Sequence, residues 1–141
     1  MTELNLRTVL PLFLGAICST LFAACSPDTP NAPTGLSAES QDGAVSLNWN
    51  TVEGGDVKGY NVYRSTNQFG ETSQASKINE SLVKDPSFTD DEVTNGTTYH
   101  YRTASVAKAS GFLGFVGGGT KKSNPSDEVK ETPFSDPPDR P

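Results

Sequence analysis

The chain has 141 residues, of which 33% are hydrophobic and 20% charged, with a formal net charge of −6 at pH 7. The acidic excess argues against nucleic acid or an anionic membrane surface as a direct partner of the folded part. His100 is the only histidine, which excludes a histidine-based catalytic triad and a cluster of histidine metal ligands. No Gly-rich loop follows a strand and opens a helix, so we expect no nucleotide and no other cofactor.

The first 24 residues have the pattern of a signal peptide. The apolar run TVLPLFLGAICSTLFAA, Thr8 to Ala24, follows the basic Arg7, is interrupted by Pro11 and ends in small residues. This run is short for a membrane span, and its arrangement is typical of an export signal. Cys25 comes directly after Leu-Phe-Ala-Ala, and this junction resembles the lipobox of bacterial lipoproteins.

The lipobox resemblance implies that the mature chain begins at Cys25 and is anchored in the cell membrane or the outer membrane, with its domain exported from the cytoplasm. Each buried methylene of an acyl chain contributes roughly 0.8 kcal/mol, so two or three chains hold a protein firmly. Two alternatives are an ordinary secreted protein with a free cysteine and a signal anchor that is never cut. Cys18 lies inside the signal, so we expect no disulfide in the mature chain.

The remaining chain divides by composition into a tether, one domain and a tail. Residues 25–33 combine the lipidated cysteine with the Pro-rich stretch SPDTPNAP, which favours extended backbone. Residues 34–132 are long enough for one small domain with a modest core. Residues 133–141 form a second Pro-rich segment.

Within residues 34–132 the apolar side chains recur at every second position, the period of a strand with one buried face. The stretches AVSLNWN and GYNVYRS alternate in this way, and TTYHYRTASVA is a longer run rich in aromatic and β-branched residues. Clusters of Gly, Asn and Asp separate the three stretches as turns. Short strands without a helical stripe predict a sandwich or barrel. In AVSLNWN the alternation puts Val45, Leu47 and Trp49 on one face, and in GYNVYRS it puts Tyr60 and Val62 opposite Tyr63. The residues expected to be structural are Trp49, Tyr60, Val62, Tyr99 and Tyr101.

The order and spacing of these stretches resemble a fibronectin type III domain from Asn31 to Thr132. The most specific parts are Trp49, the segment GYNVYR and the segment VTNGTTY. The resemblance implies an all-β, immunoglobulin-like sandwich of seven strands. It also implies that Trp49 lies at the centre of the core and that Tyr99 is a tyrosine corner, with its hydroxyl bonded to the backbone near Val93.

The predicted strand within TTYHYRTASVA departs from the family pattern at Thr103 and Ser105, where apolar residues are usual. We therefore expect the core near the end of this strand to be thin. The acidic segment TDDE, Thr89 to Glu92, has the oxygen ligands that Ca²⁺ prefers. Acidic residues before this turn are also common in the resembled family, and we favour that interpretation, so no metal site is predicted.

The segment from Ala109 to Ser126 is long for a hairpin loop and unusually apolar. Its glycines surround four large apolar residues, which form the candidate binding loop: Phe112, Leu113, Phe115 and Val116. Three explanations are open. The side chains cover the open end of the sandwich, dock on a protein partner, or enter a lipid headgroup region with help from Lys121 and Lys122.

The sequence therefore predicts a protein without catalytic residues. The first hypothesis is a membrane-anchored cell-envelope lipoprotein whose domain binds a protein partner or acts as a spacer. The alternative is an accessory carbohydrate-binding module of an extracellular polysaccharide system, in which exposed aromatic residues such as Tyr63 contact sugar rings. We expect no enzymatic activity, because the sequence offers no recognisable set of catalytic residues.

Overall fold

The computed structural model describes residues 29–109 and 119–135. These residues form strands apart from one short 3-10 helix, η1 (Thr72–Gln74). Within them, no helix has the length and apolar character needed to cross a membrane. In chain order the strands are β1 (Ser37–Gln41), β2 (Ala44–Asn48), β3 (Val57–Ser65), β4 (Ser76–Lys77), β5 (Ser87–Asp90), β6 (Tyr99–Lys108), β7 (Thr120–Lys122) and β8 (Val129–Glu131).

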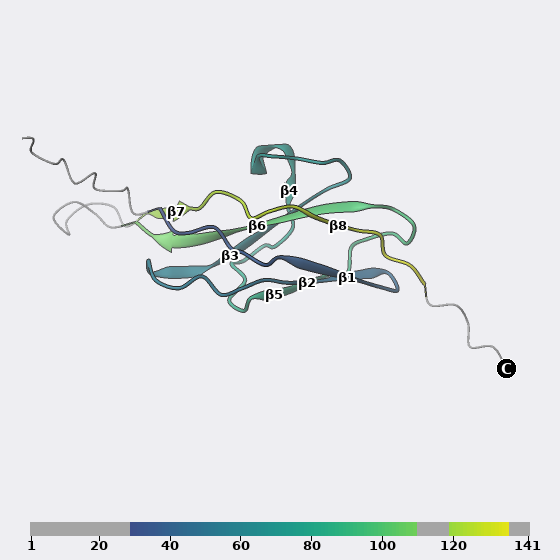
Figure 1. Cartoon of the computed structure of the whole chain (residues 1–141), viewed down its shortest axis with the longest axis horizontal. Coiled ribbons are helices and arrows are strands. Elements are labelled where there is room, and N and C mark those ends of the chain that lie inside the picture. The colour runs from purple at the N-terminus through teal and green to yellow at the C-terminus, as the bar shows by residue number, and fades with distance from the viewer. Residues whose placement is uncertain (1–28, 110–118, 136–141) are drawn as a thin grey trace, which may run out of the picture.

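The strands form two antiparallel sheets packed face to face (Figure 1). One sheet has the order β1-β2-β5, and the other has the order β4-β3-β6-β7 with β8 also paired to β6. The predicted all-β sandwich is confirmed. β7 pairs with the end of β6 and β8 with its beginning, so the last of the seven expected strands is present as two segments.

The interruption of the last strand has a local cause in the sequence. Pro125 has no backbone N–H to donate to a ladder, and it lies between two buried serines. The hydroxyl of Ser123 accepts a hydrogen bond from Ser105 N at 3.0 Å, and the hydroxyl of Ser126 accepts one from Thr103 N at 3.0 Å. Serine side chains thus take over as backbone partners of β6 where regular pairing stops.

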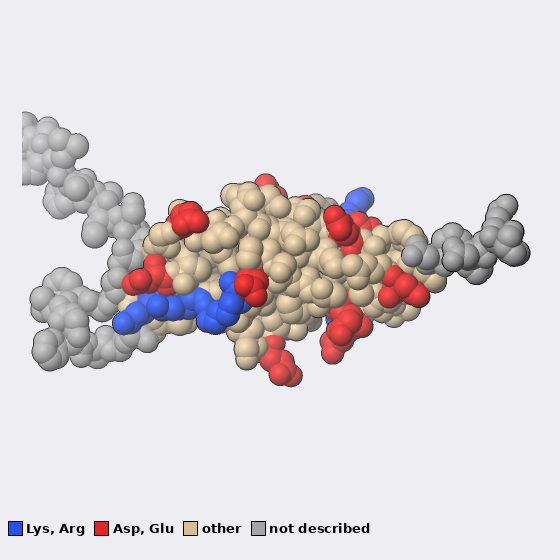
Figure 2. Space-filling model, turned by 90° about the horizontal axis from the view of Figure 1, so that it is seen from below, with Lys and Arg blue, Asp and Glu red and all other residues tan. Residues whose placement is uncertain are grey.

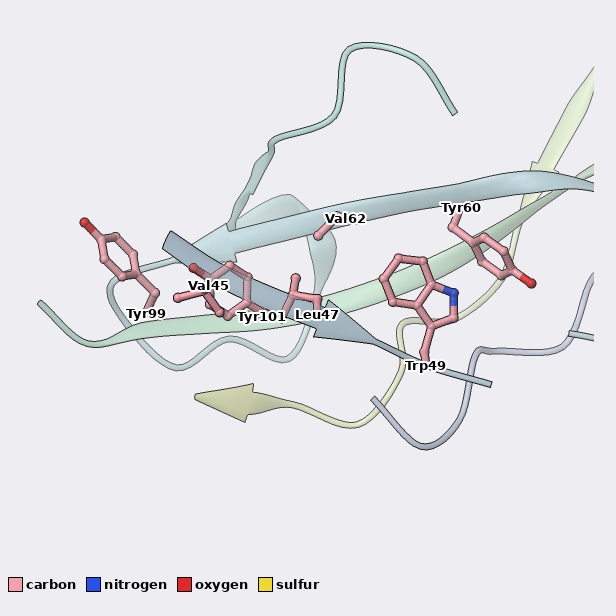
Figure 3. Packing of buried hydrophobic residues seen from close by; sticks show 7 residues of the cluster. All are labelled: Val45, Leu47, Trp49, Tyr60, Val62, Tyr99 and Tyr101. Carbon is pink, nitrogen blue, oxygen red and sulfur yellow. The ribbon is translucent and has the colours of Figure 1, made fainter. Parts of the chain in front are cut away.

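The alternation read from the sequence is present in β2, where Val45 and Leu47 are buried. They pack with Val62 from β3 and Tyr101 from β6 in the row of side chains shown in Figure 3. Burial of these large apolar groups is the main force that holds the two sheets together.

Thr103 and Ser105 are fully buried, so the polar positions noted in the sequence do lie in the interior. The Ser105 hydroxyl donates a 2.6 Å hydrogen bond to the carbonyl of Asn31. The Thr103 hydroxyl has no hydrogen-bond partner among the described residues. The N-terminal segment therefore satisfies one of the two polar groups.

Gly59 is required at an irregularity in β3. The pairing of β3 with β6 shifts between Val57 and Gly59, and Gly59 has a φ of 146°, a value that side chains rarely permit. A Cβ at this position would also collide with the carbonyl oxygen of Val83. Any other residue here would be strained and would displace the backbone around Val83.

The chain enters the sandwich at one end of its long axis and leaves it at the other (Figure 1). Asn31 is bonded to Ser105, near the end of β6, whereas the Pro133 carbonyl accepts a 2.8 Å hydrogen bond from Gly96, just before β6 begins. Figure 2 shows basic side chains gathered toward the entry end of one face, with acidic side chains spread along that face.

Candidate functional site

Two of the predicted functional elements lie outside the described residues. These are the lipidation site, Cys25, and the candidate binding loop, Phe112, Leu113, Phe115 and Val116. The base of that loop is described. Ala109 N donates a 2.8 Å hydrogen bond to the Gly119 carbonyl, next to the pairing of Lys108 with Thr120. The hairpin base therefore lies at the entry end of the sandwich.

The residues expected to be structural lie in the interior. Trp49 is 5% exposed, and its ring meets that of Tyr60 edge-on at 5.4 Å between centroids. The Tyr60 hydroxyl accepts a 2.9 Å hydrogen bond from Val52 N. Figure 3 shows this pair at one end of the row of core side chains and Tyr99 at the other.

Tyr99 lies at the start of β6 and closes the preceding turn. Its hydroxyl accepts a 3.1 Å hydrogen bond from the backbone N–H of Thr94, the residue after Val93. The contact joins the turn to the first residue of the strand that follows it. This is the kind of contact that the resemblance implied for Tyr99.

An ion pair connects the two sheets beside Tyr99. Arg64 on β3 donates from Nη1 to both carboxylate oxygens of Asp90 on β5, at 2.7 and 2.9 Å, and to the Glu92 carbonyl at 3.0 Å. The Tyr101 hydroxyl donates to Asp90 at 2.9 Å. Burial, and next the Asp90 carboxylate, raise the pKa of Tyr101, so its hydroxyl remains a donor.

This ion pair accounts for part of the acidic segment TDDE. Asp90 is 3% exposed, and its carboxylate is occupied by Arg64, Tyr101 and the backbone N–H of Glu92. Within the described residues, no group of three or more His, Cys, Asp and Glu side chains is arranged to hold a metal ion. The buried acid of this segment thus serves as an ion-pair partner.

The segment between β3 and β4 folds over the outer face of the larger sheet. Phe69 from this segment is 3% exposed and packs with Tyr63 and Ala104 in a second apolar cluster. Tyr63 is therefore only 6% exposed, and its hydroxyl is contacted by Lys122 Nζ at 3.3 Å. The expectation that Tyr63 is an exposed platform for sugar rings is wrong, because Phe69 covers it.

Polar contacts hold the Phe69 segment in place. The Glu128 carboxylate accepts hydrogen bonds from Phe69 N and from His100 Nδ1, both at 3.0 Å, and Arg102 Nε donates to the Phe69 carbonyl at 2.8 Å. Burial opposes ionisation of Glu128. The bonds from Phe69 and His100 and the charge of Arg102 outweigh it and lower the pKa of Glu128.

The position of the Phe69 segment over the sheet, and the contacts that hold it there, could not be predicted from the sequence. A lone aromatic residue, Phe69, in a polar segment was its only local signal, and its partners Arg102 and Glu128 are far away in the sequence.

A polar hollow of about 530 Å³ opens beside the ion pair. It is bounded by the end of β3, by η1 and by β4, and its lining residues are Arg64, Ser65, Thr66, Ser73, Gln74, Ala75, Ser76 and Tyr99. Arg64 lies over the Tyr99 ring, with 5.4 Å from Cζ to the ring centroid. The hollow combines one cation with several hydroxyl groups, and no local sequence pattern predicts it.

Comparison with known protein families gives a match over most of the described domain. The model for the fibronectin type III domain "SaeA third domain" matches residues 33–115. Among curated proteins, the chain is 32% identical over 100 residues to exoglucanase B of Cellulomonas fimi, and 38% identical over 77 residues to an amylopullulanase of Thermoanaerobacter thermohydrosulfuricus. These alignments cover 67% and 55% of this chain, which spans only 8% and 5% of those relatives.

Solved structures show the same fold. A Fn3-like protein from Clostridium thermocellum has a TM-score of 0.55 at 24% identity, with 79% of this chain and 99% of that chain covered. The fn3 domain of human contactin 1 has a TM-score of 0.57 at 16% identity, with 79% and 84% covered. At these identities the likeness concerns the fold alone.

Proposed function

The chain belongs to the fibronectin type III family, and on that premise we propose that it is a non-catalytic, lipid-anchored protein of the cell envelope. Its domain acts as a spacer or binds another envelope protein. Domains of this type are typically non-catalytic, and the short shared segment does not carry over the enzymatic activity of the much longer relatives.

The observation that carries the proposal is the placement of the first and last described segments of the domain. The chain enters beside Ser105 and leaves beside Gly96, at opposite ends of the long axis (Figure 1). An anchor at Cys25, joined to Asn31 by a short Pro-rich tether, would hold one end of the sandwich near the membrane. The opposite end would then point away from the lipid, as a spacer requires.

Membrane fractionation tests the anchor. A Cys25→Ser variant removes the thiol that would carry the lipid, and Cys18→Ser is the matched control inside the signal. We expect the wild type and Cys18→Ser in the membrane fraction and Cys25→Ser released or retained as uncut precursor. A Cys25→Ser chain that is processed and stays in the membrane like the wild type would contradict lipid anchoring.

The candidate binding loop supports a partner close to the membrane. Its base, where Lys108 pairs with Thr120, lies at the entry end, and Lys108 N donates to the Asp56 carbonyl there. With an anchor at the same end of the sandwich, the base of the loop would lie close to the membrane surface. Basic side chains gather toward this end of one face (Figure 2). We nevertheless propose a protein neighbour, because the net charge of −6 opposes binding of the whole chain to anionic headgroups.

Crosslinking in native membranes tests this partner. In the variant, the apolar residues of the loop become serine: Phe112, Leu113, Phe115 and Val116. If the loop binds a protein, the variant loses a specific crosslinked species and keeps the melting temperature of the wild type. A variant that melts far below the wild type would instead assign the loop to the core.

A second candidate function is carbohydrate binding, favoured by the relatives. Exoglucanase B and the amylopullulanase carry names of polysaccharide-degrading enzymes, and each shares a segment like this chain. Since Tyr63 is covered, sugar binding would need another site. Binding curves against envelope glycans that stay flat would remove this candidate.

A further inference from the structure

We infer that the hollow beside Arg64 is a binding site for a carboxylated sugar, such as a uronic acid unit of a polysaccharide. The inference is independent of the lipid anchor and gives the carbohydrate-binding candidate a site. It rests on the hydrogen-bonding groups that line the hollow and on their free capacity.

The guanidinium of Arg64 has hydrogen-bond donors that its ion pair does not use. All three of its hydrogen bonds, to both oxygens of Asp90 and to the Glu92 carbonyl, leave from Nη1. Among the described residues, Nε and Nη2 have no hydrogen-bond partner. These two nitrogens form one edge of the planar fork, and that edge matches a carboxylate with two parallel N–H···O bonds.

The Arg64 guanidinium is accessible from the hollow and is held in place by its neighbours. The Arg64 side chain is 19% exposed and lines the hollow, so a ligand can reach it. The ion pair with Asp90 and the Tyr99 ring hold the guanidinium in place. A fixed donor pair loses little conformational entropy when a ligand binds.

The rest of the lining of the hollow is mostly polar. Four hydroxyl-bearing residues and one amide surround Arg64: Ser65, Thr66, Ser73, Ser76 and Gln74. The Gln74 carbonyl is taken by Gly70 N and Glu71 N, which leaves its NH₂ group as a donor. No acidic side chain is among the described residues that line the hollow, although the chain as a whole is acidic.

These groups select the ligand class. A carboxylate fits the free edge of Arg64. Sugar hydroxyls fit the serine and threonine hydroxyls, which can donate or accept, and the Gln74 NH₂ group, which can donate. A hollow of about 530 Å³ has room for one or two sugar units. A neutral sugar would leave the Arg64 edge without an ionised partner and would bind more weakly.

The test is an NMR titration of the full chain in detergent micelles with trigalacturonic acid. Maltotriose is the neutral sugar control, and sodium acetate is the carboxylate without a sugar. We expect saturable shifts of the Arg64 Nε–H and of the Ser65, Thr66 and Gln74 amides with trigalacturonic acid, and apparent affinities on the order of tenfold weaker for both controls.

Variants locate the site. Arg64→Lys keeps the charge beside Asp90 and loses the two-nitrogen edge, and it should weaken trigalacturonic acid binding on the order of tenfold. Ser73→Phe places a large ring at the hollow without touching the ion pair, and it should abolish the shifts. Ser81→Phe, an exposed serine outside the hollow, is the matched control and should bind like the wild type.

Several outcomes would overturn the inference. They are no shifts at these residues, equal binding of maltotriose, full reproduction of the shifts by acetate, or unchanged binding by folded Arg64→Lys. If Arg64→Lys fails to fold, the comparison of Ser73→Phe with Ser81→Phe decides, and equal binding by these two would contradict the site. Failure here leaves the membrane fractionation result unaffected, so the two proposals are tested separately.

Discussion

The Tyr101 hydroxyl donates a 2.9 Å hydrogen bond to Asp90 and thereby joins strand β6 of one sheet to strand β5 of the other. Arg64 on β3 binds the same carboxylate, so a buried acid receives two donors from the facing sheet. A buried carboxylate is tolerated only when it is paired and hydrogen-bonded in this way. The ion pair therefore fixes how the two sheets face each other.

Tyr101→Phe removes one of the two donors from the opposite sheet and leaves Asp90 with Arg64. Because a hydrogen bond to a charged group contributes about 1.5 to 3 kcal/mol, we expect the free energy of unfolding to fall by that amount. Urea denaturation followed by Trp49 fluorescence measures it. Equal stability of variant and wild type would show that the hydroxyl contributes nothing to the sheet contact.

The same substitution changes how stability depends on alkaline pH. The pKa of Tyr101 is raised in the folded state above its unfolded value of about 10, so the unfolded chain releases this proton first. The contribution of Tyr101 is present below pH ~10 and is lost as the pH rises toward the folded value. We expect the stability advantage of the wild type over Tyr101→Phe to shrink by roughly 1.4 kcal/mol per pH unit above pH ~10. A constant difference from pH 8 to pH 11.5 would contradict the buried hydrogen bond.

Tyr99→Phe removes the acceptor of the Thr94 N–H and should lower the free energy of unfolding by about 1 to 3 kcal/mol. Tyr63→Phe is the matched control. Its hydroxyl has only a 3.3 Å contact with the Lys122 ammonium, which keeps a 2.6 Å hydrogen bond to the Thr72 hydroxyl, so we expect a smaller loss. Denaturant melts that rank the two variants in the opposite order would refute the role of Tyr99 in the turn.

Trp49→Ala deletes the largest side chain of the core and should lower the free energy of unfolding by roughly 3 to 5 kcal/mol. Trp49→Phe should lose less, since an aromatic ring remains and the indole N–H has no hydrogen-bond partner among the described residues. Thermal and urea denaturation followed by circular dichroism measures both variants. A loss below about 1 kcal/mol for Trp49→Ala would show that the indole contributes little to the stability of the core.

Glu128→Gln should loosen the Phe69 segment at neutral pH. Since the pKa of Glu128 is lowered in the folded state, its contribution is present above the unfolded value of about 4.3 and is lost as the pH falls through the folded value. We expect faster amide hydrogen exchange at Phe69 in the variant, and a difference in stability from the wild type that disappears in acid. Glu39→Gln, at an exposed residue of β1, serves as the control and should leave the exchange of Phe69 unchanged.

The fold could be predicted because its signals are local. The period-two pattern placed Val45 and Leu47 on the buried face of β2, and turn residues marked where strands end. The break in the last strand also has a local sign, Pro125. Its consequence depends on the buried hydroxyls of Ser123 and Ser126, which bond to β6 before and after this proline. Side-chain replacement of a backbone ladder is a tertiary event that periodicity does not reveal.

The candidate site could not be predicted for the same reason. Alternation correctly placed Tyr63 on the face opposite Tyr60, but only the tertiary fold shows that Phe69 covers that face. The free edge of Arg64 depends on which nitrogen binds Asp90, 26 residues away in the sequence. Composition and spacing carry no information about such an arrangement.

Mass spectrometry of the N-terminal peptide of the chain purified from native membranes is the sharpest test of a lipid-anchored domain. We expect a mature chain that begins at Cys25 and carries the mass of a diacylglyceryl group on its sulfur. A chain that begins at another residue, or a Cys25 with a free thiol, would contradict it.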